Sequence, residues 1–183
     1  MHGHAIAGRE LAKEILLEIL RRSGGEVCGK TRLHEVFYLA HICHFQRHGR
    51  LLSDWPIVRA PHGPGIGQAD ELIGELAEEG RVAVETEDGL SRGPLLRLRR
   101  AGGSKLGAEE KVAILETIME TTALRAAPER SRSWREGSDG EELNIYLDAI
   151  PDDELERRRR ALSEVADLVR HHSPASLSSS PHP

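Results

Sequence analysis

Four histidines within one segment are the residues whose type and spacing come nearest to a chemical site. They are separated by seven, three and four positions: His34, His41, His44 and His48. Spacings of three and four residues bring side chains to one face of a helix, where two imidazoles can bind one zinc or nickel ion. No recognisable motif pairs these histidines with a cysteine or a carboxylate. We therefore expect a polar rim on a core helix, assign no cofactor and no metal, and keep a metal sensor as a third hypothesis.

A glycine-rich loop, "HGPGIG" at residues 62–67, raises the question of phosphate binding. It lacks the Gly-Lys-Ser/Thr ending of a Walker loop and the G-x-G-x-x-G spacing of a dinucleotide site. A proline in the loop also removes a backbone N–H that a phosphate cradle would use. We predict instead a structural turn formed by Pro61, Gly63 and Pro64. The candidate partner-binding residues are His62 in this turn and three histidines of the preceding helix: His41, His44 and His48.

Basic residues gather near position 100, where they could contact phosphates as the wing of a DNA-binding domain would. The candidate nucleic-acid contacts are Arg92, Arg97, Arg99 and Arg100. The segment before them, however, carries five carboxylates and no lysine or arginine: Asp70, Glu71, Glu75, Glu78 and Glu79. Such a helix would be repelled by DNA, so a DNA-binding regulator is the alternative function and nucleic acid the less favoured partner.

Signatures of catalysis are missing from the sequence. There is no G-x-S-x-G, H-E-x-x-H or protein-kinase pattern, and the acidic residues are scattered along helical segments. We predict that the protein is not an enzyme. The run "RRRR" at residues 157–160 follows Asp153, Glu154 and Glu156, so we expect ion pairs along one helix rather than a nucleic-acid patch.

Composition indicates one globular domain with an aliphatic core. The 183 residues are 38% hydrophobic, 30% charged and only 3% aromatic, and the net charge is -5. No apolar run approaches the roughly 20 residues of a membrane span, and the N-terminus lacks the order of a secretory signal. We therefore expect a cytoplasmic protein with no membrane partner. Cys28 and Cys43 match no cysteine motif, and we assign them no role.

Periodicity predicts the elements that must position these residues. Helices are expected at residues 9–22, 30–48, 68–79, 108–127, 141–150 and 151–170, a strand around Ile57 and Val58, and a β-hairpin at residues 81–100. Glu14 and Glu18 are expected to be solvated. The helix at 108–127 is expected to bury one side, made of Val112, Leu115, Ile118, Met119 and Thr122.

These elements define a mainly α fold with a small β-hairpin, an α+β class. A helix, a short helix and a hairpin in that order are typical of a winged-helix module. We predict a flexible N-terminus at residues 1–8, a single compact domain at 9–170 and a disordered tail at 171–183, where serine, proline and histidine dominate.

The segment "LHEVFYLAHICHFQRHGRLLSDWPIVRAPHGPGI" resembles the opening of the Panacea domain, also called SocA-like. In that family an apolar helix leads through a turn and an extended segment to a Gly-Pro pair. The helix is matched by Leu33, Val36, Phe37, Tyr38 and Ala40, the turn by Gly49, Leu51 and Leu52, and the pair by Gly63 and Pro64. The family usually has an aromatic residue before the pair, where this chain has His62. Leu124 and Trp134 resemble its C-terminal half more weakly.

The resemblance implies a helical, non-enzymatic interaction domain. Members of the family serve as toxin-neutralising antitoxins or as adaptors that present a partner for proteolysis. The expected partner is therefore a protein, either a toxin or a client, and a homodimer is compatible with the apolar helix at residues 30–48.

Overall fold

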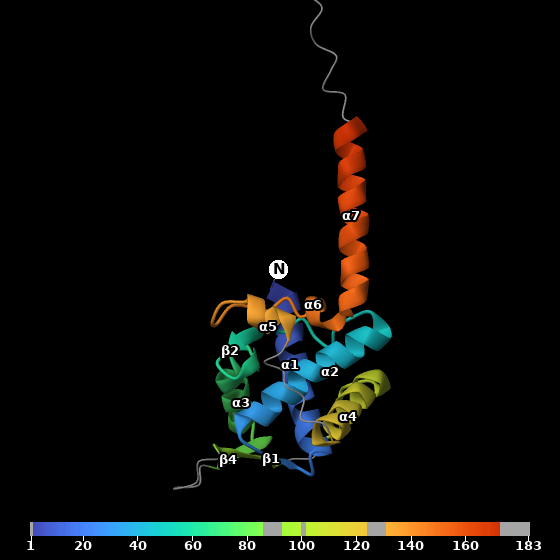
Figure 1. Ribbon diagram of the computed structural model, residues 1–183. Coiled ribbons are helices and arrows are strands. Elements are labelled where there is room, and N and C mark those ends of the chain that lie inside the picture. Colours follow the sequence, from blue (N-terminus) through green and yellow to red (C-terminus); the bar gives the residue numbers. More distant parts are fainter. Residues whose placement is uncertain (1, 86–92, 100–101, 124–130, 173–183) are drawn as a thin grey trace, which may run out of the picture. The chain divides into compact units, whose positions relative to one another are not determined.

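The structure is a computed structural model that describes residues 2–85, 93–99, 102–123 and 131–172. It is a mainly helical α+β fold, as the sequence predicted (Figure 1). The chain divides into two compact units, Met1–Ala149 and Ile150–Pro183, where the sequence predicted one domain over residues 9–170. Of the predicted tail, residues 173–183 lie outside the described residues.

The first unit contains six helices and five strands within the described residues. Its helices are α1 (His2–Arg22), α2 (Lys30–His48), α3 (Ala69–Glu78), α4 (Ala108–Ala123), α5 (Arg132–Glu136) and α6 (Tyr146–Ala149). Its strands are β1 (Glu26–Cys28), β2 (Ile57–Ala60), β3 (Gly63–Ile66), β4 (Val82–Glu85) and β5 (Leu95–Leu98). The second unit contains α7 (Asp152–His172).

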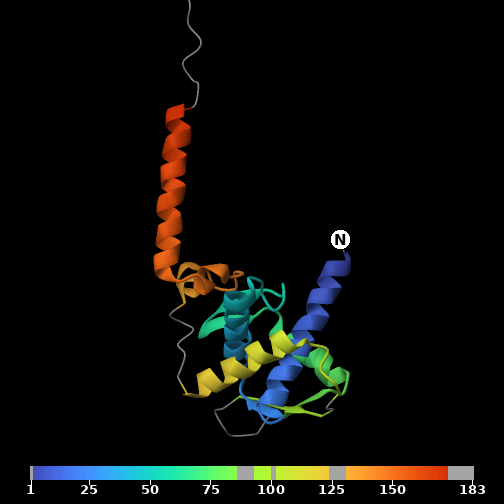
Figure 2. The same cartoon turned by 90° about the vertical axis from the view of Figure 1, so that its right-hand side faces the viewer.

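Helices α1 and α2 form the centre of the first unit. α1 begins at His2, whereas the sequence predicted a flexible segment up to residue 8. Leu33, Val36 and Phe37 of α2 pack with the buried aliphatic residues of α1 in one core. α2 ends where predicted, because Gly49 has a φ of 68° and donates its N–H to the carbonyl of Phe45. In Figure 2, α4 lies across α1 and α2.

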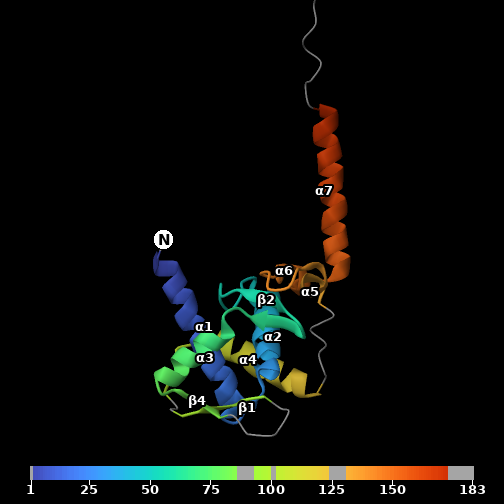
Figure 3. The ribbon, with the colours of Figure 1, turned by 90° about the vertical axis from the view of Figure 1, so that its left-hand side faces the viewer.

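The predicted hairpin is the core of a three-stranded antiparallel sheet. β4 pairs with β5, and β5 pairs on its other edge with β1, giving the order β1-β5-β4. The sequence did not predict β1, because three residues between glycines are too few to show alternation. Figure 3 shows this sheet at the ends of α1 and α3. The loop of the hairpin, residues 86–92, lies outside the described residues.

The predicted turn at Pro61, Gly63 and Pro64 is a second hairpin. β2 and β3 pair from Ile57 with Ile66 to Ala60 with Gly63, so Gly63 and Pro64 belong to a strand. Only Pro61 and His62 form the turn. The prediction of a turn was wrong for Gly63 and Pro64, because both pair with β2 as part of β3; Gly63 does so with a positive φ of 127°.

The segment after α5 pairs with β2 through backbone hydrogen bonds, on the edge of β2 that does not face β3. Arg59 N–H donates to the carbonyl of Glu141 at 2.8 Å, and Leu143 N–H donates to the carbonyl of Ile57 at 2.7 Å. The helix predicted at residues 141–150 is therefore wrong in its first half, where backbone pairing with β2 holds the chain extended. Only α6 is helical in that range.

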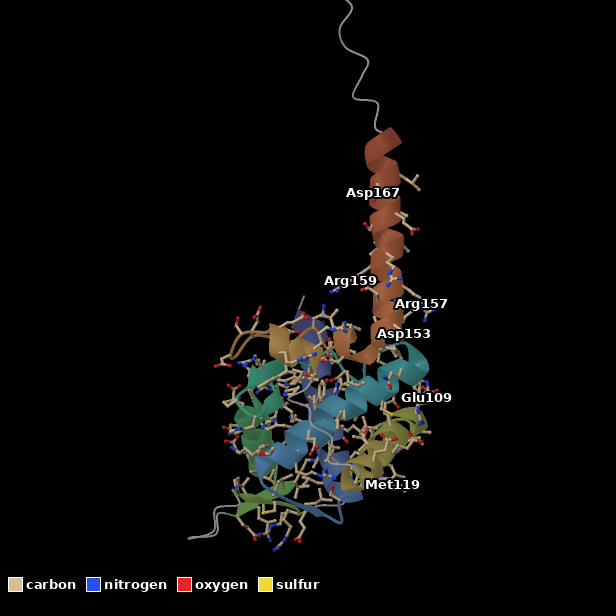
Figure 4. The ribbon with its side chains drawn as sticks, in the orientation of Figure 1. Glu109, Met119, Asp153, Arg157, Arg159 and Asp167 are labelled. Carbon is tan, nitrogen blue, oxygen red and sulfur yellow. The ribbon has the colours of Figure 1, made fainter. Side chains whose placement is uncertain are left out.

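Helix α4 buries a different side from the one predicted. Ala113, Ile114 and Thr117 are buried, whereas Val112 and Met119 are 45% and 64% exposed. Ile118 of the predicted side does pack, partly buried, against the core, so the buried side of α4 is displaced from the predicted one rather than opposite to it. Met119 is labelled on the outer part of α4 in Figure 4. Residues 124–127 of the predicted helix lie outside the described residues.

Candidate functional site

The histidines of α2 divide into a pair that builds the fold and a pair that lies beside a carboxylate. His34 accepts a hydrogen bond from the N–H of Ile66 at 3.0 Å, which ties α2 to β3. Burial lowers the pKa of His34 below its usual value, so the ring is a neutral acceptor at neutral pH. His34 therefore links α2 to β3 through this hydrogen bond.

His41 uses both of its ring nitrogens inside the core. Nδ1 lies 2.8 Å from the carbonyl oxygen of Phe37, and Nε2 lies 2.9 Å from Oγ of Ser53. A carbonyl can only accept, so Nδ1 carries the proton and Nε2 accepts the Ser53 hydroxyl hydrogen. Full burial lowers the pKa of His41 to about 4.

A serine hydroxyl bonded to an oriented imidazole also has the geometry of a nucleophile and its base. Ser53 lines a hollow of about 380 Å³ between the segment 51–57 and residues 142–146. A general base works best with a pKa near the working pH, and the pKa of His41 lies far below neutrality. Because both groups are buried, this pair better fits a structural hydrogen bond.

Two predicted contact residues are wrong for that role. His41 and His44 are fully buried, because the face of α2 that carries them packs inside the first unit. His48 at the end of α2 and His62 in the turn between β2 and β3 are exposed. The interpretation of four histidines as one accessible face therefore fails for the two central ones.

His44 and His48 meet Glu109 at the junction of α2 and α4. The two imidazole rings are stacked at a tilt with centroids 4.6 Å apart. Nδ1 of His48 lies 3.7 Å from Oε2 of Glu109. One ligand atom from each of the three residues lies within 4.8 Å of the other two. The i,i+4 histidine pair is visible in the sequence, but the glutamate is not, because it lies 61 positions beyond His48 and is brought beside it only by the packing of α4 on α2.

The backbone fixes which nitrogen of His44 carries the proton. Nδ1 lies 2.8 Å from the carbonyl oxygen of Arg50, so Nδ1 must donate. Nε2 is then an acceptor with a lone pair. This atom is buried and has no hydrogen-bond partner among the described residues.

Arg50 and Glu110 complete the surroundings of this cluster. Arg50 lies 3.2 Å from a carboxylate oxygen of both Glu109 and Glu110. Partial burial disfavours the ionised form of Glu110, but hydrogen bonds from its own N–H and from Arg50 outweigh it and lower the pKa of this carboxyl. Arg50 therefore keeps an ion-pair partner, Glu110, if the carboxylate of Glu109 rotates away from it. Glu109 is labelled at the start of α4 in Figure 4.

The predicted nucleic-acid contacts are balanced by carboxylates where the structure describes them. Arg97 lies 3.3 Å from both Glu26 and Glu85, and Arg99 lies 3.6 Å from Glu85. Arg92 and Arg100 lie outside the described residues. Four of the five carboxylates in the acidic segment 70–79 have partners as well: Arg9 contacts Glu71 and Glu75, Lys13 contacts Glu79, and Lys30 contacts Asp70.

Helix α7 has the ion pairs that the sequence predicted. Arg157 lies 3.2 Å from Asp153, Arg158 lies 2.8 Å from Glu154, and Arg160 lies 3.3 Å from Glu156, each pair four residues apart. Between and beyond these charges, α7 exposes Leu162, Val165 and Leu168 by 69%, 55% and 59%. Spacings of three residues keep them on one side of the helix. We call these three residues the α7 stripe. The sequence-based prediction for this helix rested on its charged residues alone, so it did not include the α7 stripe.

Comparisons with known proteins give no further guide: no family model, no curated protein and no solved structure matches the chain. Within the described residues, no helix combines the length and the apolar character needed to cross a membrane.

Proposed function

We propose that the protein is a non-enzymatic protein-interaction module, in which α7 pairs with α7 of a second copy of the chain. The observation that carries the proposal is the α7 stripe. Three large apolar side chains on one helix, each more than half exposed, are what a pairing helix presents before association.

Helix pairing would also stabilise α7 itself. The helix has 21 residues, about 30 Å of length, and isolated helices of this size depend on tertiary packing for most of their stability. Ion pairs between exposed side chains four residues apart add only about 0.3–0.5 kcal/mol each. Burying the stripe against a second stripe supplies the larger contribution, since a buried leucine side chain is worth about 1.5–3 kcal/mol.

The α7 stripe fits an antiparallel pair centred on Val165. In that arrangement, Leu162, three positions before the centre, lies opposite Leu168, three positions after it, in the second copy, so the two stripes meet along their length. In a parallel pair, the run of arginines at residues 157–160 would lie beside its own copy, and like charges would repel. Arg157 and Arg159 of this run are labelled on α7 in Figure 4.

The Panacea resemblance supports the same class of function, because members of that family act by binding proteins. Under this proposal an antitoxin or adaptor role would use the dimer to bind a toxin or client. The DNA-binding alternative has less support, since Arg97 and Arg99 are balanced by carboxylates and α3 is acidic.

The test is sedimentation equilibrium of the full chain at about 150 mM salt, with the variant Leu162→Glu. We expect a dimer for the wild-type chain. Leu162→Glu should weaken the dimer by at least about 100-fold, because two charges would replace two leucines buried between the helices. Met119→Glu on α4 is the matched control, since Met119 is equally exposed and should leave the dimer unchanged.

A pair of opposite charges in the stripe tests the antiparallel arrangement. Leu162→Glu combined with Leu168→Lys should restore the dimer that Leu162→Glu alone weakens, because in an antiparallel pair each glutamate lies opposite a lysine, whereas in a parallel pair like charges would meet. A wild-type chain that stays monomeric at about 100 μM would overturn the proposal. A dimer that is lost with Met119→Glu but kept with Leu162→Glu would show that the dimer contact lies on α4 and not on α7. A different protein bound in stoichiometric amount through Leu162 would replace the second copy as the occupant.

A further inference from the structure

We propose that His44, His48 and Glu109 form a binding site for one divalent transition-metal ion, with Zn²⁺ as the best match to the ligands. Two imidazoles and a carboxylate are a common ligand set for zinc, and they leave a coordination position for water. The proposal does not depend on the dimer, because all three residues belong to the first unit.

The orientation of His44 is the first observation that points to a ligand. Its Nδ1–H donates to the carbonyl oxygen of Arg50, which leaves the lone pair of Nε2 free to bind. A metal-binding histidine almost always donates its other ring N–H to a carbonyl, a carboxylate or a water in this way. A buried acceptor with no donor destabilises the folded protein, and binding a cation would remove that cost.

The spacing of the three ligand atoms is the second observation. In a tetrahedral site with zinc–ligand bonds of about 2.0–2.1 Å, two ligand atoms lie about 3.3 Å apart. Nδ1 of His48 and Oε2 of Glu109 are already 3.7 Å apart, and all three ligand atoms lie within 4.8 Å. The required movement is small and falls on His48, whose side chain is partly exposed, and on Glu109, whose side chain is exposed, while the ring of His44 stays fixed by Arg50.

The guanidinium of Arg50 is the one cation close to the cluster among the described ion pairs, and its position is compatible with a bound metal. It contacts Glu109 and Glu110 at the same distance, 3.2 Å. When Glu109 turns toward the metal, Glu110 still holds Arg50. The carboxylate that binds the metal can therefore change partners without leaving a cation unpaired.

Two other histidines of α2 cannot join the site. Both ring nitrogens of His41 are hydrogen bonded, and Nδ1 of His34 accepts from Ile66. Of the four histidines that the sequence offered as possible metal ligands, only His44 and His48 therefore belong to the proposed site. The third ligand comes from α4, so the metal would link the end of α2 to the start of α4.

The experiment is titration of the untagged full chain with Zn²⁺ by calorimetry and with Co²⁺ by visible absorption. We expect one ion per chain and a tetrahedral Co²⁺ spectrum. His48→Ala and Glu109→Gln should each weaken Zn²⁺ binding by at least about 100-fold, since losing even an outer partner of a ligand costs 10- to 100-fold. Both residues are exposed, so these variants should keep the melting temperature of the metal-free protein while losing its rise with Zn²⁺.

Controls distinguish this site from other histidines of the chain. His62→Ala in the turn between β2 and β3 should bind Zn²⁺ as the wild-type protein does. His2→Ala with His4→Ala should also bind normally. Binding that survives His48→Ala and Glu109→Gln would overturn the proposal, as would binding that is lost only when the N-terminal histidines are replaced. A wild-type dissociation constant above about 100 μM would overturn it as well.

Discussion

Nε2 of His41 accepts the hydroxyl hydrogen of Ser53 across 2.9 Å, and both side chains are buried. The other ring nitrogen is held by the carbonyl of Phe37 in the same helix. The pair thus connects the centre of α2 to the segment that leads into β2. Each group depends on the other for its hydrogen bond, because both side chains are buried.

Ser53→Ala should destabilise the protein by about 1–3 kcal/mol, because Nε2 of His41 would remain buried without a donor. The measurement is the free energy of unfolding by urea. Ser138→Ala is the control, since Ser138 is exposed and its loss should change the free energy by less than about 0.5 kcal/mol. The same variant tests the non-enzymatic proposal: hydrolysis of an activated ester that disappears with Ser53→Ala would contradict it.

Stability should fall as the pH drops from about 6.5 to about 4. The pKa of His41 is about 4 in the folded protein and close to 6.5 in the unfolded chain, so between these values the unfolded state binds more protons. The full contribution of His41 is present above pH 6.5, is lost progressively on acidification, and amounts to about 3 kcal/mol.

Urea unfolding of the wild-type protein and of His41→Gln at intervals from pH 7.5 to 4.5 measures this dependence. The variant should lose most of the slope but retain the part due to His34, whose pKa is also lowered by burial. Equal slopes for the two proteins would show that the protonation of His41 is not coupled to folding.

Gly63→Val should destabilise the first unit by about 1–3 kcal/mol. Gly63 has a φ of 127°, a region that side chains with a branched Cβ rarely enter. Gly74→Ala in α3 is the matched control. A Cβ at position 74 meets no atom within 4 Å, and alanine favours helix, so this variant should be neutral or stabilised by up to about 1 kcal/mol. Melting temperatures of the two variants measure the difference.

The orientation of α4 can be checked with two substitutions on opposite sides. Ile114→Ala should cost about 2–5 kcal/mol, because Ile114 is fully buried in the core. Met119→Glu should change the free energy of unfolding by less than about 0.5 kcal/mol, because Met119 is exposed. The reverse ranking in urea unfolding would restore the side of α4 that periodicity alone predicted.

Duplex DNA should bind weakly or not at all. The arginines of β5 and its exit that the structure describes lie beside Glu26 and Glu85, and α3 adds further carboxylates on exposed positions. Fluorescence anisotropy with a labelled duplex at about 50 mM salt is the measurement. Binding that weakens with salt and is abolished by Arg97→Ala with Arg99→Ala would support the DNA-binding alternative instead.

The fold could be predicted where one side of an element is buried. The core residues of α2 and α3 follow a three- and four-residue pattern, and the predicted hairpin pairs as β4 and β5. The buried residues of α1 could not be predicted in this way, because α1 lies at the centre of the first unit. Glu14 and Glu18, predicted to be solvated, are buried, since the helix is covered on several sides. Glu14 is held by Arg81 at 2.7 Å and Glu18 by Arg21 and Arg22 at 2.9 Å, contacts that periodicity does not reveal.

The candidate sites likewise contain some residues that the sequence pattern predicts and others that only tertiary packing brings together. The spacing of His44 and His48 is visible in the sequence, but the burial of His41 and the approach of Glu109 depend on tertiary packing. The strand pairing of Gly63 with Ala60 was hidden because glycine and proline are poor strand formers in isolation. The three-residue spacing of the α7 stripe is visible in the sequence, but the charged residues of the same helix dominate its pattern.

The pairing of β1 with β5 has a consequence for how the chain acquires its structure. Glu26 and Arg97 are 71 positions apart in the sequence and are neighbours in the sheet. During synthesis, β1 therefore cannot pair until β5 has left the ribosome, after α2, the β2-β3 hairpin, α3 and β4. Contacts of such long range slow folding, so we expect the helices of the first unit to form before the sheet closes.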